Sequence, residues 1–128
     1  MSDNRERFLS LMFSSDRETM REVLTDDIVW RLPPWARARF EEPKGREQVV
    51  EFLCGGAATY YEPDSFQFQP EVQAVEGDQA VTLGWLSART AKGADYQNRD
   101  AFAFRFRDGR ICEGWELLDS AHFEAQTE

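Results

Sequence analysis

Apolar residues recur with a helical period in the first part of the chain. Over residues 8–13 they fall at i, i+3 and i+4, which is the spacing of one helix face. The segment 15–18, Ser-Asp-Arg-Glu, has the form of a capping box and predicts a second helix, ending at the acidic pair 26–27. A third helix is predicted over residues 46–54, where a glycine pair then supplies a stop.

From Ser65 onward the apolar period changes to two, which is typical of strands exposed on one side. Pro70 interrupts the first of these strands and predicts a bulge or bend. A β-rich segment, 28–32, precedes them, and three longer strands are predicted over 79–90, 95–107 and 110–119. Helices come first and hairpin-connected strands last. This order predicts the α+β class, with helices packed on one face of a curved antiparallel sheet.

The turn at Asp108-Gly109 sets the register of the last hairpin, and two registers are possible. A two-residue turn would place Arg107 opposite Arg110, which brings like charges together. A three-residue turn, with its glycine in a bulge, would place Phe106 opposite Arg110 instead. We favour the second register because it avoids the repulsion.

In the favoured register one face of the hairpin combines two acids with apolar side chains. Asp100 lies directly opposite Glu116, beside Asn98, Phe102 and Leu118. Apolar walls with a few polar groups are typical of a small-molecule pocket. There the two carboxyl groups would share a proton and form an acid/base pair. The alternative is that both acids are solvated or paired with neighbouring arginines.

Further aromatic residues are candidates for the same cavity. Trp30 and Trp85 are predicted to line it together with Leu83, and Tyr60 and Tyr61 follow the third helix and could offer a phenol to a ligand. The alternative for each is simple packing in the core or at the cavity rim.

The opposite face of the hairpin carries Ile111, Trp115 and Leu117 among charged residues. A tryptophan with two aliphatic residues and arginines is the composition of an interface core. We therefore expect a homodimer through this sheet face. A loop folded over it is the alternative.

Composition and charge narrow the classes of function. The 128 residues predict a single domain, residues 1–128, and the net charge of −9 argues against nucleic acid and anionic membranes as partners. No uncharged run approaches the roughly 20 residues of a membrane-spanning helix, and the N-terminal residues lack the apolar core of a secretory signal. Two cysteines indicate free thiols and a cytoplasmic protein. No residue spacing indicates a metal site, and no cofactor is expected.

Three stretches carry a resemblance to a known family: LTDDIVWRLP at 24–33, KGREQVVEF at 44–52, and the hairpin 96–119 with its Asp-Gly turn. With this order of elements the chain resembles the SnoaL-like branch of the ketosteroid-isomerase and nuclear-transport-factor-2-like superfamily. The resemblance implies a cone-shaped α+β fold, a cystatin-like roll, with helices on the concave face of the sheet. It also implies an apolar cavity and a homodimer through the sheet.

The resemblance also bears on catalysis. The ketosteroid-isomerase base would fall at Arg31 or Leu32 and the oxyanion acid near Phe102, so neither is present. The final-strand acid of related hydrolases and cyclases matches Glu116. We therefore expect a cofactor-independent isomerase, cyclase or hydrolase acting on a small apolar organic molecule.

In that enzyme Glu116 would be the general acid/base, Asp100 would tune it, and Asn98 would donate a hydrogen bond to the ligand. The alternative is a non-catalytic domain that binds a hydrophobic ligand or acts through dimerisation.

Overall fold

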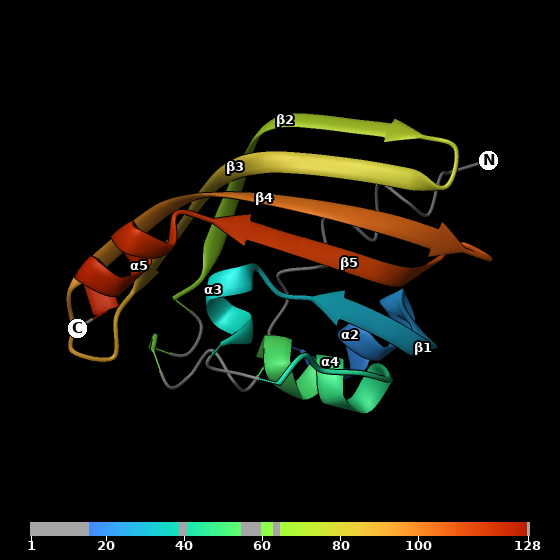
Figure 1. Cartoon of the computed structure of the whole chain (residues 1–128), viewed down its shortest axis with the longest axis horizontal. Helices are drawn as coiled ribbons and strands as arrows, with labels where there is room; N and C mark the ends of the chain where they lie inside the picture. Colours follow the sequence, from blue (N-terminus) through green and yellow to red (C-terminus); the bar gives the residue numbers. More distant parts are fainter. Residues whose placement is uncertain (1–15, 39–40, 55–59, 63–64, 128) are drawn as a thin grey trace.

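A computed structural model describes residues 16–38, 41–54, 60–62 and 65–127. Its centre is a curved sheet of five strands (Figure 1) in the order β1-β5-β4-β3-β2. The strands are β1 (Leu24–Arg31), β2 (Gln67–Glu76), β3 (Gln79–Arg89), β4 (Asp95–Arg107) and β5 (Arg110–Leu118). Strand β1 runs parallel to β5, and the other neighbours are antiparallel. The predicted α+β class and curved sheet are confirmed.

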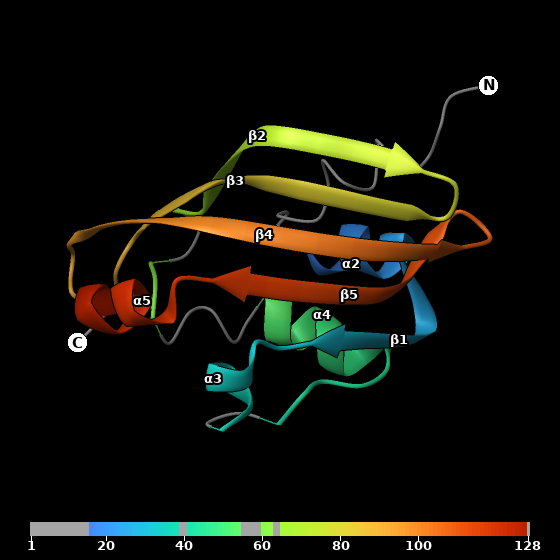
Figure 2. The same ribbon diagram turned by 45° about the horizontal axis from the view of Figure 1, so that its top comes forward.

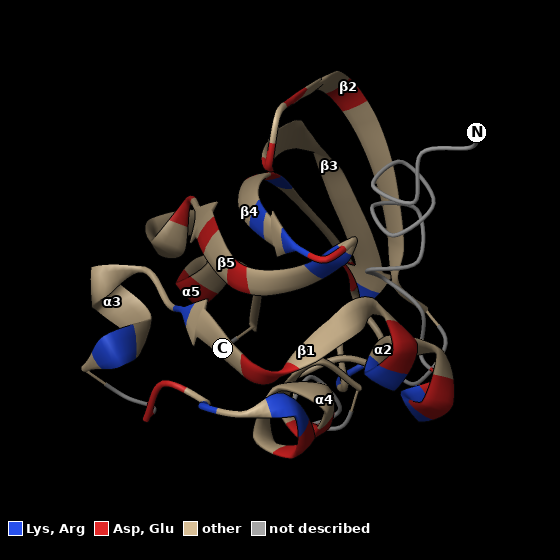
Figure 3. Ribbon diagram, turned by 90° about the vertical axis from the view of Figure 1, so that its right-hand side faces the viewer, with Lys and Arg blue, Asp and Glu red and all other residues tan. Residues whose placement is uncertain are grey.

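Two helices, α2 (Arg17–Val23) and α4 (Arg46–Cys54), lie against the β1–β5 side of the sheet (Figure 2). Each buries an apolar pair, Met20 with Val23 and Val49 with Val50, in one core with the sheet. Figure 3 shows acidic and basic residues interspersed on the outer sides of both helices. None of the described helices is long and apolar enough to cross a membrane.

The predicted helix over residues 8–13 lies outside the described residues, and the next helix differs from its prediction in both bounds. Asp16, rather than Ser15, caps α2, since its carboxylate accepts the Glu18 backbone N–H at 3.3 Å. Helix α2 ends at Val23 and strand β1 begins at Leu24, because Leu24 already pairs with Ile111 of β5.

The strands and the helix α4 agree closely with the elements that the hydrophobic pattern of the sequence predicts. Strand β4 and helix α4 have the predicted bounds, and the bulge predicted at Pro70 is confirmed by a register shift between Pro70 and Val72. Two short helices were not predicted: α3 (Pro34–Arg37), in a segment without a clear period, and α5 (Ser120–Thr127), after the last strand.

The predicted register of the β4–β5 hairpin is wrong. The turn has two residues, with Asp108 at φ 53° and Gly109 at φ 79°, and Arg107 lies opposite Arg110. Two positive φ values are typical of the type I′ turn, which Asp-Gly favours. The Arg107 guanidinium donates two hydrogen bonds to Asp27 of β1, and this partner offsets the repulsion that argued against the register.

A bulge in β5 then changes the face on which Glu116 lies. Phe106 pairs with Ile111 but Arg105 pairs with Glu113, so Cys112 is an extra residue in β5. Without it, the two-residue turn would send the side chains of Asp100 and Glu116 to opposite faces. With it, Glu116 lies opposite Phe102, and Asp100, opposite Leu118, is its diagonal neighbour on the same face. The shared face was predicted correctly, but by a wrong pairing.

Candidate functional site

The interior face of strands β1, β4 and β5 brings two acids and an indole together. Asp100 is 1% exposed, and the indole Nε1–H of the buried Trp30 donates a hydrogen bond to Glu116 Oε1 at 3.2 Å. Each of these side chains comes from a different strand, so the sheet order, with β5 between β1 and β4, creates the cluster.

Aromatic rings form the apolar wall around these groups. The Trp30 ring lies 6.4 Å from Phe102 and 6.1 Å from Phe104, measured between centroids. Phe68 of β2 meets Phe102 edge-on at 5.6 Å. The wall keeps the acids in a medium of low polarity, in which a charge is costly.

Burial raises the pKa of both carboxyl groups. For Asp100 burial is the largest cause and the neighbouring Glu116 charge adds to it, raising the pKa to about 8. Burial also raises the pKa of Glu116, although the hydrogen bond from Trp30 favours its ionised form. The Trp30 hydrogen bond therefore favours the charge on Glu116 and the proton on Asp100.

Among the residues that the structure describes, two buried polar atoms on this face have no hydrogen-bond partner. They are Asp100 Oδ1 and the hydroxyl oxygen of Thr82, whose residue is 2% exposed. Thr82 of β3 lies opposite Phe102, so it is a diagonal neighbour of Asp100. Buried polar groups are normally satisfied, so these two atoms are exceptions on this face.

Two tyrosines complete the site, and the sequence analysis named only one of them, Tyr61, as a possible ligand contact. The Tyr61 hydroxyl forms a hydrogen bond with the Tyr96 hydroxyl, and the two ring centroids are 5.2 Å apart. Burial is the main cause that raises the pKa of both phenols, that of Tyr96 to about 12. The alternation of β4 could have revealed Tyr96, whereas Tyr61 lies in a segment without a period.

Asn98 lies in the interior as predicted, but its amide is already engaged. It donates to the Tyr96 hydroxyl at 2.8 Å and to the Asp119 backbone carbonyl at 3.0 Å. Both N–H groups of the amide are thus used, one within β4 and one in holding β4 to the residue before α5, so Asn98 is not free to donate to a ligand.

The remaining predicted ligand contacts divide between the two faces. Leu118 packs on the interior side, and Tyr60 is half-buried with its ring against Tyr61 and Phe123. Trp85 lies on the outer face, where the guanidinium of Arg99 stacks on its ring at 4.4 Å. The prediction that Trp85 and Leu83 line the interior is wrong, because Gly84 between them faces inward, opposite Asp100.

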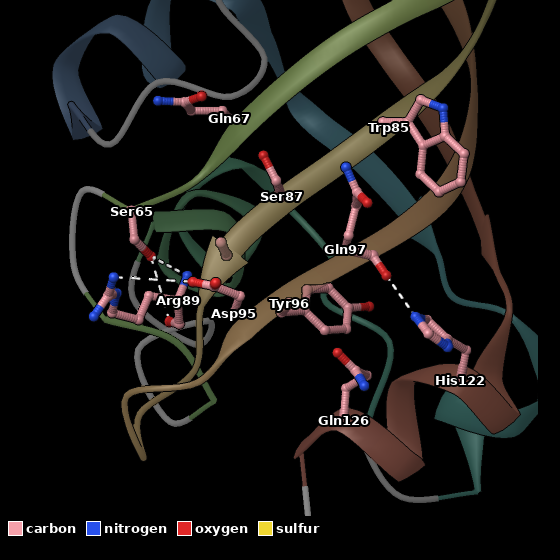
Figure 4. A pocket seen from close by; sticks show the side chains of 11 residues that line it. Ser65, Gln67, Trp85, Ser87, Arg89, Asp95, Tyr96, Gln97, His122 and Gln126 are labelled. Atoms are coloured by element: carbon pink, nitrogen blue, oxygen red, sulfur yellow. Dashed lines mark hydrogen bonds and ion pairs between the residues drawn. The ribbon is translucent and has the colours of Figure 1, made fainter.

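A depression of about 840 Å³ opens beside α5, at the end of β3 and β4 (Figure 4). Trp85, Ser87 and Gln97 line it from the sheet, and His122 lines it from α5. His122 is held by its Nε2, 2.6 Å from the Gln97 carbonyl oxygen, and this contact ties α5 to β4. Neither Asp100 nor Glu116 lines this depression.

The structure also places the two cysteines and the residue types that are able to bind metal ions. Within the described part of the chain, neither Cys54 nor Cys112 takes part in a disulfide. Within the residues that the structure describes, no three His, Cys, Asp or Glu side chains gather into a group that could hold a metal ion.

With this geometry the chain can be compared with known proteins. The profile of the SnoaL-like domain family matches residues 6–114, and the chain belongs to this family. No curated protein sequence matches it.

Solved structures of the same fold are numerous. A nuclear-transport-factor-2-like protein of unknown function from Burkholderia pseudomallei has a TM-score of 0.83 at 18% identity, covering 99% of this chain and 98% of its own. TerC, co-crystallised with polyporic acid, has a TM-score of 0.80 at 19% identity and covers 98% of each chain. IdmH from Streptomyces antibioticus, a proposed polyketide cyclase, has a TM-score of 0.74 at 26% identity, covering 97% of this chain and 95% of its own.

Proposed function

We propose that this protein binds a small, largely apolar organic molecule on the interior face of its sheet and catalyses proton transfer on it without a cofactor. The observation that carries the proposal is that Asp100 Oδ1 has no hydrogen-bond partner among the described residues and is buried beside Glu116 and an aromatic wall. A polar atom in that position costs stability unless a ligand satisfies it.

The two carboxyl groups differ in environment and take different roles. Glu116, ionised with the help of Trp30, accepts a proton from a carbon next to a carbonyl group. The electrons of the broken C–H bond pass into the enolate, and neutral Asp100 donates a hydrogen bond to its oxygen. Glu116 then returns the proton to the same or another carbon, which completes an isomerisation or prepares a ring closure.

Two structural neighbours support the ligand class. TerC was crystallised with an organic acid, polyporic acid, and IdmH is a proposed polyketide cyclase. The Tyr61–Tyr96 pair and the Phe102 wall of this chain fit a flat, mostly apolar molecule with a few oxygen atoms.

The proposal is tested by proton exchange. With 2-tetralone in D2O, followed by NMR, we expect the protein to accelerate deuterium incorporation beside the carbonyl. Glu116→Gln is expected to lower that rate by about 100-fold, because the amide keeps the shape and loses the base. Glu113→Gln, on the outer side of the same strand, is the matched control and should retain the rate.

Binding of aromatic ketones with no exchange in any protein sample would contradict catalysis. It would favour the second candidate function, a non-catalytic domain that binds a hydrophobic ligand. The unpartnered oxygen of Asp100 serves a bound molecule in either case.

We also propose that the outer face of the sheet binds a second copy of the chain. Two adjacent rows of apolar side chains cross four strands on that face. The rows are Val72–Leu83–Ala101–Leu117 and Ala74–Val81–Ala103–Trp115.

Large side chains in these rows remain exposed: Val72 by 61%, Val81 by 52% and Leu117 by 57%. Ion pairs flank the rows on both sides, Arg99 with Glu71 and Arg105 with Glu113. A two-fold axis would bring such a patch onto itself, apolar centre on centre and charges at the rim.

One residue predicted for this interface belongs elsewhere. Ile111 is fully buried in the core, where it pairs with Leu24, because the two-residue turn places it opposite Phe106 and so turns it inward. Trp115 and Leu117 lie on the outer face, and the Arg105 guanidinium lies 5.6 Å from the Trp115 ring centroid.

Leu117→Asp is expected to convert the dimer into monomer, because it places an unpaired charge at the centre of the patch. Sedimentation velocity at micromolar concentration measures the change. Lys92→Asp, in the exposed turn between β3 and β4, should leave the dimer intact. A wild-type protein that sediments as a monomer at these concentrations would refute the proposal.

A further inference from the structure

The indole of Trp30 holds Glu116 in a fixed place. Its Nε1–H donates to Oε1 at 3.2 Å, and Trp30 itself is 1% exposed. No other hydrogen bond to Glu116 occurs within the described part of the chain, so Oε2 is left for a ligand. The donor comes from β1 and the acceptor from β5, which run parallel side by side.

The ring of Trp30 reaches Glu116 only because residue 114 is glycine. Trp30 lies beside Gly114 in the β1–β5 pairing, two residues before the acid. A Cβ atom on Gly114 would lie 2.5 Å from Trp30 Cζ3 and 2.6 Å from Cε3. The indole therefore occupies the space that a side chain at position 114 would fill.

Neighbouring rings close the other sides of the indole. Phe104 lies opposite Gly114 and Phe102 lies opposite Glu116, and both contact the Trp30 ring. A ring enclosed in this way keeps one rotamer, so its N–H is directed at Glu116 before any ligand arrives.

The other ionisable groups around Glu116 do not share this role. Asp100 and Tyr96 face it from β4, and Tyr61 faces it from the segment after α4. None of the three can stabilise its negative charge as a cation would. Among the described residues, the Trp30 N–H is the one polar group that favours the ionised carboxylate.

We propose that Trp30 is a positioning residue for Glu116, and that position 114 must be glycine so that the Trp30 indole can lie over β5 and hold one carboxylate oxygen of Glu116. The role in catalysis rests on the proposed function above. The hydrogen bond and its effect on Glu116 do not, and they can be measured without any substrate.

The experiment is NMR titration of the protein with 13C-labelled glutamate carboxyl groups, Glu116 being assigned from Glu116→Gln. We expect Trp30→Phe, which keeps an apolar ring, to raise the Glu116 titration midpoint by about one pH unit, because a donor to a charged acceptor is lost. The wild-type Trp30 indole N–H resonance should shift with the same midpoint, and in Glu116→Gln that shift should vanish.

Trp115→Phe, on the outer face, is the matched control and should leave the Glu116 midpoint unchanged. Gly114→Ala should move the midpoint upward as Trp30→Phe does, since the ring must retreat from the new Cβ atom. Circular dichroism establishes that each variant is folded. An unmoved midpoint in folded Trp30→Phe, or an indole resonance that ignores the titration, would overturn the proposal. Failure of the 2-tetralone exchange alone would leave it standing.

Discussion

Asp100→Asn is expected to stabilise the folded protein by about 4 kcal/mol at pH 7 and by almost nothing at pH 4. The folded-state pKa of Asp100 is raised to about 8, mainly by burial, whereas an unfolded aspartate titrates near 4. The folded state therefore binds more protons between these values, and its stability falls as the pH rises through that window. An asparagine at position 100 keeps the shape of the side chain and has no charge to bury, so it removes the fall in stability with rising pH.

Urea denaturation at a series of pH values from about 4 to about 8 measures this difference. Asp95→Asn is the matched control, since Asp95 begins the same strand with a side chain that is 96% exposed, and its stability should follow the wild-type curve because Asp100 is intact. Parallel stability curves for wild type and Asp100→Asn would mean that Asp100 is hydrated and ionised at neutral pH. The acid/base pair would then not exist.

Gly84→Ala is expected to destabilise the protein by about 3 kcal/mol or more, because it forces backbone against backbone. A Cβ atom at position 84 would lie 2.2 Å from the Gln69 carbonyl oxygen and 2.8 Å from Pro70 Cα. Neither atom belongs to a flexible side chain. Strand β2 would have to leave β3 at its bulge, directly across the sheet from Asp100.

Thermal and urea unfolding measure the loss. Gly77→Ala serves for comparison, because its Cβ would meet nothing within 4 Å and only its φ of 58° is unfavourable. That variant should cost about 1 kcal/mol. Equal losses in the two variants would show that the close approach of β2 at Gly84 does not constrain the sheet.

The local sequence pattern determined the elements that depend on neighbouring residues. Strict alternation predicted β4 over residues 95–107, and the bulge at Pro70 followed from its missing N–H. The same alternation placed Asp100 and Phe102 on one face of the sheet. These properties follow from the period of a strand and from turn chemistry, which contacts elsewhere in the fold do not change.

Tertiary contacts decided which face of β5 is buried. The Arg107–Asp27 pair makes the two-residue turn acceptable, and both of its partners were in the sequence, but 80 residues apart. The bulge at Cys112 brings Glu116 inward, and the Trp30 ring fills the space over Gly114. A one-residue change of register turns every side chain of a strand to the opposite face. The register of β5 is fixed by its long-range pairing with β1. The shared face of the two acids and Phe102 could therefore be predicted from the sequence, while their pairing, the Trp30 donor, Tyr96 and the outward turn of Trp85 could not.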